Sequence, residues 1–486
     1  MQLNRPDLLR TQAYINGTWT ESHCGCTFDV DNPADGQLVE CVADCGKEDA
    51  ERAVRAAHAA FPAWSGSTAK QRAKLLHQWY ALQKAHLDDL ALLLTTEQGK
   101  PLAEAKGEVL YGMSFVKWFA EEAQRNYGDT IPAPAANQRI LTIRQAVGVV
   151  AAITPWNFPH AMITRKIAPA LAAGCTVVIK PAEDTPLTAL ALAQLAHEAG
   201  FPPGVINVVP TSDAADVGEV LTGSPLVRKL SFTGSTEVGR LLMEQCAPTL
   251  KKLSLELGGN APFIVFDDAD LDAAVAGCMA AKYRNGGQTC ICVNRIYVQA
   301  GVYDTFVAKL AEANGELRQG AGTEPGVDLG PLINRAGYQK VSRLVEAAVE
   351  AGATVAHRAS PAEGALFYPP TVLADAQPDM AIHREEIFGP VAAVYRFDTE
   401  AEVVRLANDT PFGLASYFYS QNAARCWRVG EALEYGMVGI NNTGISTAVA
   451  PFGGVKQSGF GREGSKYGLE DFTVLKYLNW GVEADT

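Results

Sequence analysis

The feature that most constrains the fold is a series of short segments that are apolar throughout and that alternate with helical patterns. The expected strands and helices are, in order, Val147–Thr154, Pro159–Ala173, Thr176–Lys180, Pro186–Ala199, Val205–Val209 and Leu226–Phe232, followed by a helix from Ser235. A strand without a polar face must be buried on both faces, which requires a parallel sheet covered by helices. The sequence therefore predicts an α/β fold.

The length of the chain, 486 residues, predicts more than one domain, because single hydrophobic cores stop growing at about 250–300 residues. A second alternating unit begins near Ala261 and continues to about Tyr419. The tail from Tyr467 ends in Phe472–Leu478, an alternating strand that needs a partner, and this partner could lie in another subunit.

The N-terminal third has a different character. In Ala13–Trp19 the pair Asn16-Gly17 indicates a hairpin turn. From Lys47 to about Tyr127 the pattern is helical, and Gln98-Gly99-Lys100-Pro101 interrupts it.

Charge and composition exclude several classes of protein. The formal net charge of −13 argues against nonspecific nucleic-acid binding, which depends on Lys and Arg neutralising phosphates. Residues 1–10 lack the apolar core of a secretory signal, and no apolar run reaches the roughly 18–20 residues that cross a bilayer. We expect a cytoplasmic protein without nucleic-acid or membrane partners.

The ten cysteines are scattered through the chain, unlike the framework of a small secreted domain. Cys24, Cys26, Cys41 and Cys45 form a cluster in sequence, but their spacings match zinc-binding patterns poorly and only His23 is nearby. We expect no metal site.

Three segments carry groups suited to chemistry on a carbonyl. In Asn285-Gly-Gly-Gln-Thr-Cys290 a thiol follows a glycine pair, and nearby backbone N–H groups would lower its pKa. Glu256 lies in an uncharged apolar stretch, where a carboxylate is either desolvated as a general base or held by a structural partner. Asn157 follows a buried strand and could cap a helix or stabilise an oxyanion. Alone, Cys290 would more often be a buried, inert thiol.

Together these segments resemble the aldehyde dehydrogenase superfamily, and the resemblance covers nearly the whole chain. Its motifs are Pro155-Trp-Asn-Phe-Pro159, Lys180-Pro-Ala-Glu183, Phe232-Thr-Gly-Ser-Thr236, Glu256-Leu-Gly-Gly259, Gly287-Gln-Thr-Cys290, Glu386-Ile-Phe-Gly-Pro390 and Pro451-Phe-Gly-Gly454. Each is weak alone, but seven in order form a specific signal.

The resemblance implies a fold with two parallel-sheet, Rossmann-like domains and a small β oligomerisation arm. The NAD(P)-binding domain would comprise residues 1–127 and 148–260, and the catalytic domain residues 261–446. The arm would comprise residues 128–147 and 467–486, in a homodimer or homotetramer.

The resemblance also implies a reaction. Cys290 would attack an aldehyde, Asn157 and the Cys290 N–H would hold the oxyanion, and Glu256 would activate water to release the acid from a thioester. NAD would accept the hydride, with NADP possible.

The cofactor-binding residues implied are Thr154, Pro155, Trp156, Lys180, Glu183, Gly234, Ser235, Gly239, Glu386 and Phe388. No GxGxxG follows the first strand, so Gly234-Ser-Thr-Glu-Val-Gly239 would approach the pyrophosphate instead. Glu183 favours NAD, because a carboxylate can accept from a ribose 2′-hydroxyl but repels a 2′-phosphate.

Further motifs resemble the succinate semialdehyde branch of the family. They are Met162-Ile-Thr-Arg-Lys166, Lys282-Tyr-Arg-Asn285 and the segment Ser458–Gly468. The branch implies that Arg165, Arg284 and Ser446 bind the far carboxylate of succinate semialdehyde. Arg165 points away from the apolar face of its helix, and Arg284 is close enough in sequence to share the pocket of Cys290.

Several alternatives stay open. Glutarate semialdehyde is one methylene longer, and Cys292 is a candidate partner of Cys290 in a redox switch. A coenzyme-A-acylating enzyme would not need Glu256, and a structural or binding protein on the same fold would not need Cys290. A cofactor-free thiol hydrolase would want a Cys–His pair, yet none of the eight histidines lies in these motifs.

Overall fold

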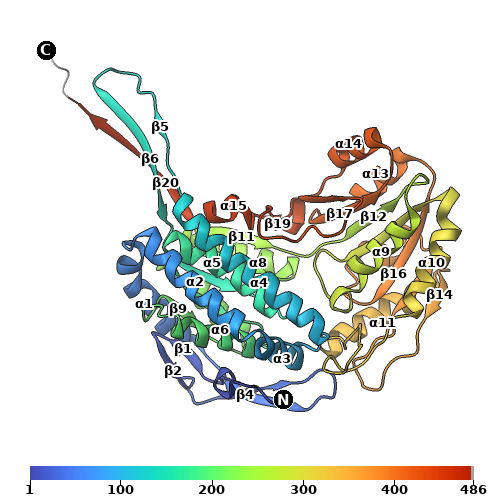
Figure 1. Ribbon diagram of the computed structural model, residues 1–486, viewed down its shortest axis with the longest axis horizontal. Coiled ribbons are helices and arrows are strands. Elements are labelled where there is room, and N and C mark those ends of the chain that lie inside the picture. Colours follow the sequence, from blue (N-terminus) through green and yellow to red (C-terminus); the bar gives the residue numbers. More distant parts are fainter. Residues whose placement is uncertain (483–486) are drawn as a thin grey trace.

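In the computed structural model, which describes residues 1–482, two twisted sheets lie side by side with helices packed against both (Figure 1). The predicted positions 483–486 of the arm lie outside the described residues.

The first sheet has eight strands, and its five central strands are parallel. In spatial order the strands are β19 (Gly459–Phe460), β11 (Lys252–Glu256), β10 (Val227–Thr233), β7 (Val149–Ile153), β8 (Thr176–Lys180), β9 (Ile206–Val208), β1 (Ala13–Ile15) and β2 (Thr18–Thr20). The parallel sheet predicted from the apolar strands is confirmed.

Helices cover both faces of this sheet because side chains alternate along each strand. Val150 and Ala152 pack in the core beneath α2–α6, whereas Val149 and Ala151 pack in the core formed with α1, α7 and α8. The helices are α1 (Lys47–Ser65), α2 (Ala69–Ala85), α3 (Leu87–Gln98), α4 (Leu102–Glu122), α5 (Pro159–Ala173), α6 (Pro186–Glu198), α7 (Ala214–Gly223) and α8 (Thr236–Cys246).

The second sheet has seven strands, six of them parallel. Its order is β14 (Thr354–Arg358), β15 (Thr371–Ala374), β16 (Val391–Phe397), β13 (Val293–Gln299), β12 (Ala261–Val265), β17 (Ala415–Tyr419) and β18 (Met437–Ile440). Its helices are α9 (Leu271–Tyr283), α10 (Tyr303–Gly315), α11 (Arg335–Glu350), α12 (Ala381–Arg384), α13 (Glu400–Asn408) and α14 (Ala423–Ala432).

A small three-stranded sheet projects from the body (Figure 1). It contains β5 (Thr130–Ile131), β6 (Gln138–Ala146) and β20 (Thr473–Gly481). The tail strand, β20, was expected to need a partner strand, which could have come from another subunit. The structure instead pairs β20 with β6 of the same chain, from Thr473 opposite Ala146 to Gly481 opposite Gln138.

The remaining elements are the hairpin of β3 (Thr27–Asp31) and β4 (Leu38–Ala43) and the short helix α15 (Ser465–Glu470). The predicted turn at Asn16-Gly17 is confirmed, with both residues at positive φ between β1 and β2. Among residues 1–482, no helix is both long and apolar enough to cross a membrane.

Candidate active site

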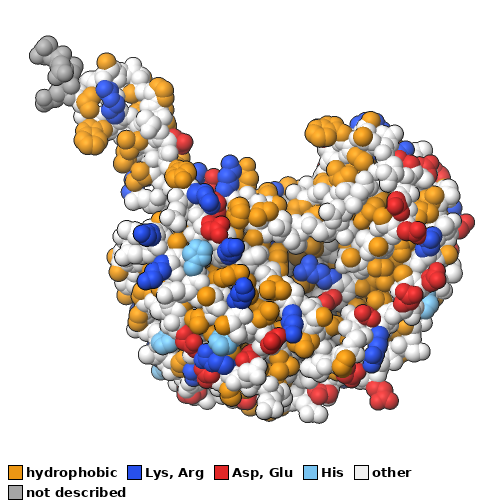
Figure 2. All heavy atoms as spheres, in the orientation of Figure 1, with side chains coloured by type: hydrophobic (Ala, Val, Ile, Leu, Met, Phe, Trp, Pro, Cys, Tyr) orange, Lys and Arg blue, Asp and Glu red, His pale blue; other side chains and the backbone are white. Residues whose placement is uncertain are grey.

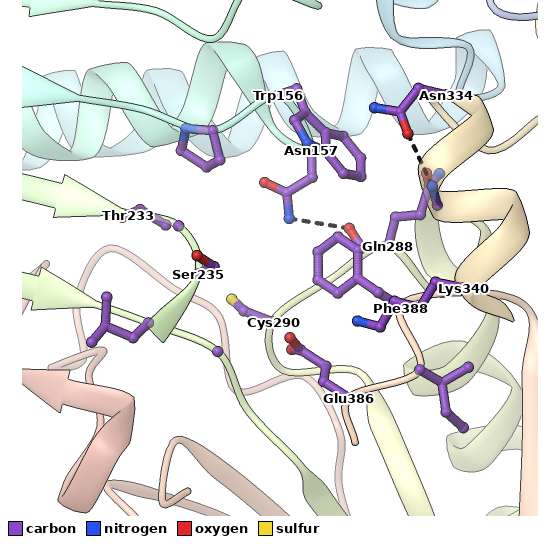
Figure 3. A pocket seen from close by; sticks show the side chains of 16 residues that line it. Trp156, Asn157, Thr233, Ser235, Gln288, Cys290, Asn334, Lys340, Glu386 and Phe388 are labelled. Carbon is purple, nitrogen blue, oxygen red and sulfur yellow. Dashed lines mark hydrogen bonds between the residues drawn. The ribbon is translucent and has the colours of Figure 1, made fainter. Parts of the chain in front are cut away.

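A pocket lies where the strand order of the first sheet reverses direction, which is called the switch point. From β7 the chain continues to β8 and β9 on one side, and then to β10 and β11 on the other. Ligands of open α/β sheets bind beyond the carboxyl ends of the strands at such a point. There, Pro155–Asn157 after β7 and Thr233–Ser235 at the end of β10 form one wall of a pocket of about 310 Å³. The other wall comes from the second unit, with Cys290, Glu386 and Phe388 (Figure 3).

Tight backbone contacts bring Cys290 to this pocket. After α9 ends, Asn285, Gly286 and Gly287 adopt φ values of 52°, 62° and 79°, so the chain turns sharply before β13. A Cβ on Gly287 would lie 2.1 Å from the carbonyl oxygen of Gly389, and a Cβ on Gly259 would lie 2.4 Å from that of Cys290. Only glycine permits these approaches. They place the sulfur inside the pocket (Figure 3).

The side chain of Asn157 is buried next to the sulfur, and a hydrogen bond fixes its orientation. Its Nδ2 donates to the main-chain oxygen of Gln288 at 3.1 Å (Figure 3). One N–H of the amide therefore binds the main chain two residues before Cys290, and the other N–H remains available to donate to a ligand. This arrangement suits the predicted oxyanion donor.

The expectation that backbone N–H groups lower the pKa of Cys290 is wrong for this structure. Burial raises the pKa of the thiol to about 12, and the charge of Arg165 is the main opposing influence. At neutral pH the sulfur therefore carries its proton, and an adjacent base must accept that proton when the sulfur reacts.

Glu256, at the end of β11, is the predicted base. Both of its carboxylate oxygens are buried and have no hydrogen-bond partner among the described residues. Burial, reinforced by the charge of Glu463, raises its pKa well above the usual value. Because the charges of Glu256 and Cys290 influence each other, the two groups share one electrostatic environment.

Arg165 and Lys166, in the middle of α5, both bind the buried carboxylate of Glu463. The Nε of Arg165 contacts Oε2, and the Nζ of Lys166 donates to Oε1 at 2.7 Å. Although burial opposes ionisation, these two cations hold the pKa of Glu463 below its usual range. The Cζ of Arg165 lies 4.0 Å from the centroid of the Phe452 ring. Arg165 was predicted to point away from the apolar face of its helix, and in the structure its side chain reaches Glu463.

The three predicted substrate residues converge on a residue that the sequence reasoning missed. Tyr111, on α4, has a buried hydroxyl without a hydrogen-bond partner among the described residues. Burial raises its pKa, and the charges of Arg165 and Arg284 and the neighbouring Ser446 oppose that rise. The Cζ of Arg284 lies 6.0 Å from the Tyr111 ring centroid.

Arg284 was expected to share the pocket of Cys290. Arg284 is not among the residues that line the pocket of about 310 Å³ with Cys290, and neither are Arg165 and Ser446. Arg284 lines a second pocket of about 460 Å³ that also contains Glu104, Glu108 and Asp328. The role of Arg284 in substrate binding stays a prediction.

Glu386 also lines the pocket of Cys290, and its side chain is partly exposed there. Its Oε1 accepts a hydrogen bond from the N–H of Gly259 at 3.1 Å, and burial raises its pKa to about 7. The rings of Trp156 and Phe388 meet edge to face, with centroids 5.6 Å apart. Phe388 has φ 58°, an uncommon conformation for a bulky residue and one that concentrates at functional sites.

The other predicted cofactor residues lie further along the same edge. The Nζ of Lys180 pairs with Oε2 of Glu183 at 3.1 Å. Glu183 lines a neighbouring pocket of about 390 Å³ that shares Asn334 with the first. Thr154 is buried at the end of β7. Gly239 lies inside α8, where a Cβ would be 2.5 Å from Leu257, so it permits helix packing and does not line the pocket.

Cys292, the candidate redox partner, points into the protein. Its Sγ contacts the main-chain oxygens of Lys282 at 3.3 Å and Val293 at 3.5 Å. A disulfide with Cys290 would require the Cys292 side chain to break both contacts. The redox switch between Cys290 and Cys292 stays a prediction. Within residues 1–482 no cluster of three His, Cys, Asp or Glu side chains could hold a metal ion.

Lys340 also lines the pocket of Cys290 and was not predicted. The sequence signals for the missed residues Tyr111, Lys166, Glu463 and Lys340 differ in strength. Lys166 adjoins Arg165 in a helix whose fifteen residues are all buried, and two adjacent cations in such a helix need an anionic partner. Tyr111 and Lys340 carried no local signal.

Comparisons with known proteins agree with this geometry. The profile of the aldehyde dehydrogenase family matches residues 19–478. Two relatives from Pseudomonas putida are each 58% identical: a 3-sulfolactaldehyde dehydrogenase, with 99% of both chains covered, and a glutarate-semialdehyde dehydrogenase, with 98% of this chain and 99% of the relative covered. The NADP-dependent succinate-semialdehyde dehydrogenase of Escherichia coli is 57% identical, with 99% and 100% covered.

A solved structure shows the same fold. The succinate-semialdehyde dehydrogenase of Burkholderia pseudomallei superposes with a TM-score of 0.98 at 57% identity, covering 99% of this chain and 100% of the other.

Proposed function

This chain belongs to the aldehyde dehydrogenase family, and from that premise we propose that it oxidises succinate semialdehyde to succinate with a nicotinamide dinucleotide. One observation carries the substrate assignment: Arg165 is a buried cation beside Cys290 whose Nη2 has no hydrogen-bond partner among the described residues. Glu463 pairs with its Nε, and a buried guanidinium donor that is left over needs a further acceptor, which a substrate carboxylate can provide. The three relatives are named for aldehydes that carry a carboxylate or a sulfonate.

The residues at the switch point fit a dinucleotide. Gly234 and Gly258 present backbone without side chains, and Ser235 begins helix α8 at the pocket wall. Glu386 uses one oxygen on Gly259, and its second oxygen has no partner among the described residues and can accept from a ribose hydroxyl. Lys180 and Glu183 would hold the other ribose. A bound nicotinamide would supply the hydride acceptor that turns the adduct on Cys290 into a thioester.

The protein supplies the remaining chemistry. The Cys290 sulfur bonds to the aldehyde carbon while its proton passes to Glu256, because a thiol with a pKa of about 12 is otherwise unreactive at neutral pH. The second N–H of Asn157 Nδ2 and the N–H of Cys290 then stabilise the oxyanion. Glu256 then releases this proton to solvent. In the second half, Glu256 takes a proton from water as the water oxygen attacks the thioester; the bond between carbon and sulfur breaks, Glu256 returns the proton to the Cys290 sulfur, and the carboxylic acid leaves.

A panel of aldehydes tests the proposal. We expect C4 and C5 semialdehydes with a terminal carboxylate to be oxidised with a far higher kcat/KM than uncharged aldehydes of equal length, without coenzyme A. Replacing Cys290 with Ser should abolish this activity. Preference for the uncharged aldehydes would refute the substrate class, and undiminished turnover by Cys290→Ser would refute the mechanism.

Glutarate semialdehyde is the second candidate, because a glutarate-semialdehyde dehydrogenase is equally similar. One methylene rarely changes specificity by more than about 1–3 kcal/mol. The same panel ranks the two substrates by kcat/KM.

We also propose that the projecting sheet joins subunits in a homodimer or homotetramer. One edge of β20 is unpaired within the described chain, and Figure 2 shows hydrophobic side chains along the arm. Leu475, Tyr477 and Trp480 are 59%, 59% and 69% exposed, which is an aggregation hazard for an uncovered edge strand. Light scattering should give a multiple of the subunit mass, and Leu475→Asp combined with Tyr477→Asp should reduce it.

A further inference from the structure

A buried lysine outside the seven motifs quoted above contacts the main chain of the candidate oxyanion donor. Lys100 follows Gly99, whose φ of 92° ends α3 and turns the chain inward. The Nζ of Lys100 donates to Oε2 of Glu108 at 2.5 Å and to the main-chain oxygen of Asn157 at 2.7 Å. It also lies 3.8 Å from the ring centroid of Phe158. No solvent reaches this side chain.

Asn285 contacts the same carbonyl from the other unit. Its Nδ2 donates to the Asn157 oxygen at 2.9 Å and to the Gln288 oxygen at 3.2 Å. The Gln288 oxygen in turn accepts from Nδ2 of Asn157. Asn157 is therefore held at its main-chain carbonyl by Lys100 and Asn285, and at its side chain by the loop of Cys290.

Glu108 completes the arrangement by fixing the start of α5. Its Oε1 accepts from the N–H groups of His160 at 2.9 Å and Ala161 at 3.3 Å. The carboxylate thus binds Lys100 with one oxygen and the first turn of α5 with the other. The peptide of Asn157 lies between β7 and α5, outside any helix or strand ladder, so these side chains supply the hydrogen bonds that regular structure would otherwise provide.

We propose that Lys100 is a positioning residue for oxyanion stabilisation, acting with Asn285 through the peptide of Asn157. The inference rests on the oxyanion role assigned to Asn157 under the proposed function. Without Lys100 the Asn157 carbonyl loses a charged donor and its peptide can rotate, which moves the side-chain amide relative to Cys290. A displacement of about 1 Å in such a group can lower a rate by roughly 100-fold.

A double-mutant cycle of Lys100→Met and Asn157→Ala tests the inference. Hydrolysis of p-nitrophenyl acetate is the first readout, because Cys290 would be acylated through an oxyanion without any cofactor or substrate carboxylate. Oxidation of succinate semialdehyde is the second. We expect Lys100→Met to lower kcat by roughly 10- to 100-fold in the parent, but by less than about threefold when Asn157 is already Ala.

A matched control separates positioning from loss of stability. Lys229 is equally buried and donates to Ser254, away from Asn157. Lys229→Met should lower the melting temperature but affect ester hydrolysis equally, and only slightly, in both backgrounds. If Lys100→Met fails to fold, Asn285→Asp removes the other donor to the Asn157 carbonyl and should show the same dependence on Asn157.

The outcomes are distinguishable. If Lys100→Met slows the parent and Asn157→Ala enzymes by the same factor, or slows neither, Lys100 has only a structural role and the inference is wrong. If Asn157→Ala alone retains the parent rate of ester hydrolysis, the oxyanion assignment in the proposed function is wrong and the inference falls with it.

Discussion

Arg165 uses its Nε to bind Glu463, and this contact fixes the direction of the rest of the guanidinium. Glu463 also binds Lys166, so it would keep a cationic partner if Arg165 were replaced. Nη2 of Arg165 has no hydrogen-bond partner among residues 1–482, and the guanidinium is close enough to Cys290 and Tyr111 for their charges to affect it. A buried donor in this state is costly without a ligand, and it therefore marks the place where the substrate carboxylate is expected.

Replacing Arg165 with Met should raise the KM for succinate semialdehyde by roughly 10- to 100-fold, because a charged hydrogen bond contributes about 1.5–3 kcal/mol. The KM for butanal, which has the same length without the carboxylate, should change little. Steady-state kinetics with both substrates provides the check, and thermal unfolding shows whether Glu463 remains satisfied by Lys166. Equal losses on both aldehydes would contradict the role.

Replacing Tyr111 with Phe should weaken binding of the charged aldehyde several-fold, on the order of the 0.5–1.5 kcal/mol of a neutral hydrogen bond. The ring keeps its contact with Phe115, at a centroid distance of 5.0 Å, so the fold should be unaffected. The measurement is the ratio of kcat/KM for succinate semialdehyde to that for butanal. An unchanged ratio would remove Tyr111 from the substrate site.

The pH dependence of turnover should report Glu256. The carboxylate must be ionised to take a proton, so hydrolysis of the thioester should rise with pH through the pKa of Glu256. Because burial raises that pKa, the rise should occur well above pH 4.5. Glu256→Gln should remove this rise and slow the formation of the acyl-enzyme as well as its hydrolysis, which mass spectrometry of the protein quenched at successive times can detect. An unchanged pH profile in the variant would assign the proton transfer to another group.

The choice of cofactor should depend on Glu183. The parent should have a higher kcat/KM with NAD than with NADP, because the carboxylate repels a 2′-phosphate. The side chain is 49% exposed and paired with Lys180, so the repulsion is screened well below the value for a buried pair. Glu183→Gln should therefore improve kcat/KM with NADP by roughly tenfold or less. A clear preference of the parent for NADP would contradict this assignment.

Cys292 should determine whether oxidative inactivation can be reversed. Treatment with hydrogen peroxide should convert Cys290 to a sulfenic acid, which Cys292 could attack to form a disulfide with loss of water. Dithiothreitol should then restore activity in the parent but not in Cys292→Ala. The same irreversible loss in both proteins would show that the contacts of Cys292 with the Lys282 and Val293 carbonyls prevent the disulfide.

The sequence predicted the elements whose signals are local. Pro159 begins α5 and Gly174, at φ 97°, ends it, so the expected bounds were met. The apolar strands required a doubly covered sheet, and the sheet is present. Contacts between distant segments carried no such signal. The ion pair of Arg165 with Glu463 and the meeting of Lys100, Asn157 and Asn285 depend on how the two units pack, and no local pattern records that packing.

The pKa of Cys290 is a second property that the local sequence did not predict. Glycines and backbone N–H groups nearby suggested an acidic thiol, but burial between the two units has the larger effect. Local sequence describes the covalent neighbours of a titratable group, whereas its pKa depends on the solvent that the fold removes.

The missing side chain at Gly259 allows the segment after β11 to touch the carbonyl of Cys290 directly. Nucleophile and base therefore belong to different folding units but share one backbone contact, with no flexible group between them. Enzymatic activity should consequently respond more strongly than stability to a small change in how the two units pack. A variant such as Gly259→Ala would separate them by a fraction of an ångström, and it could silence the enzyme while both halves remain fully folded.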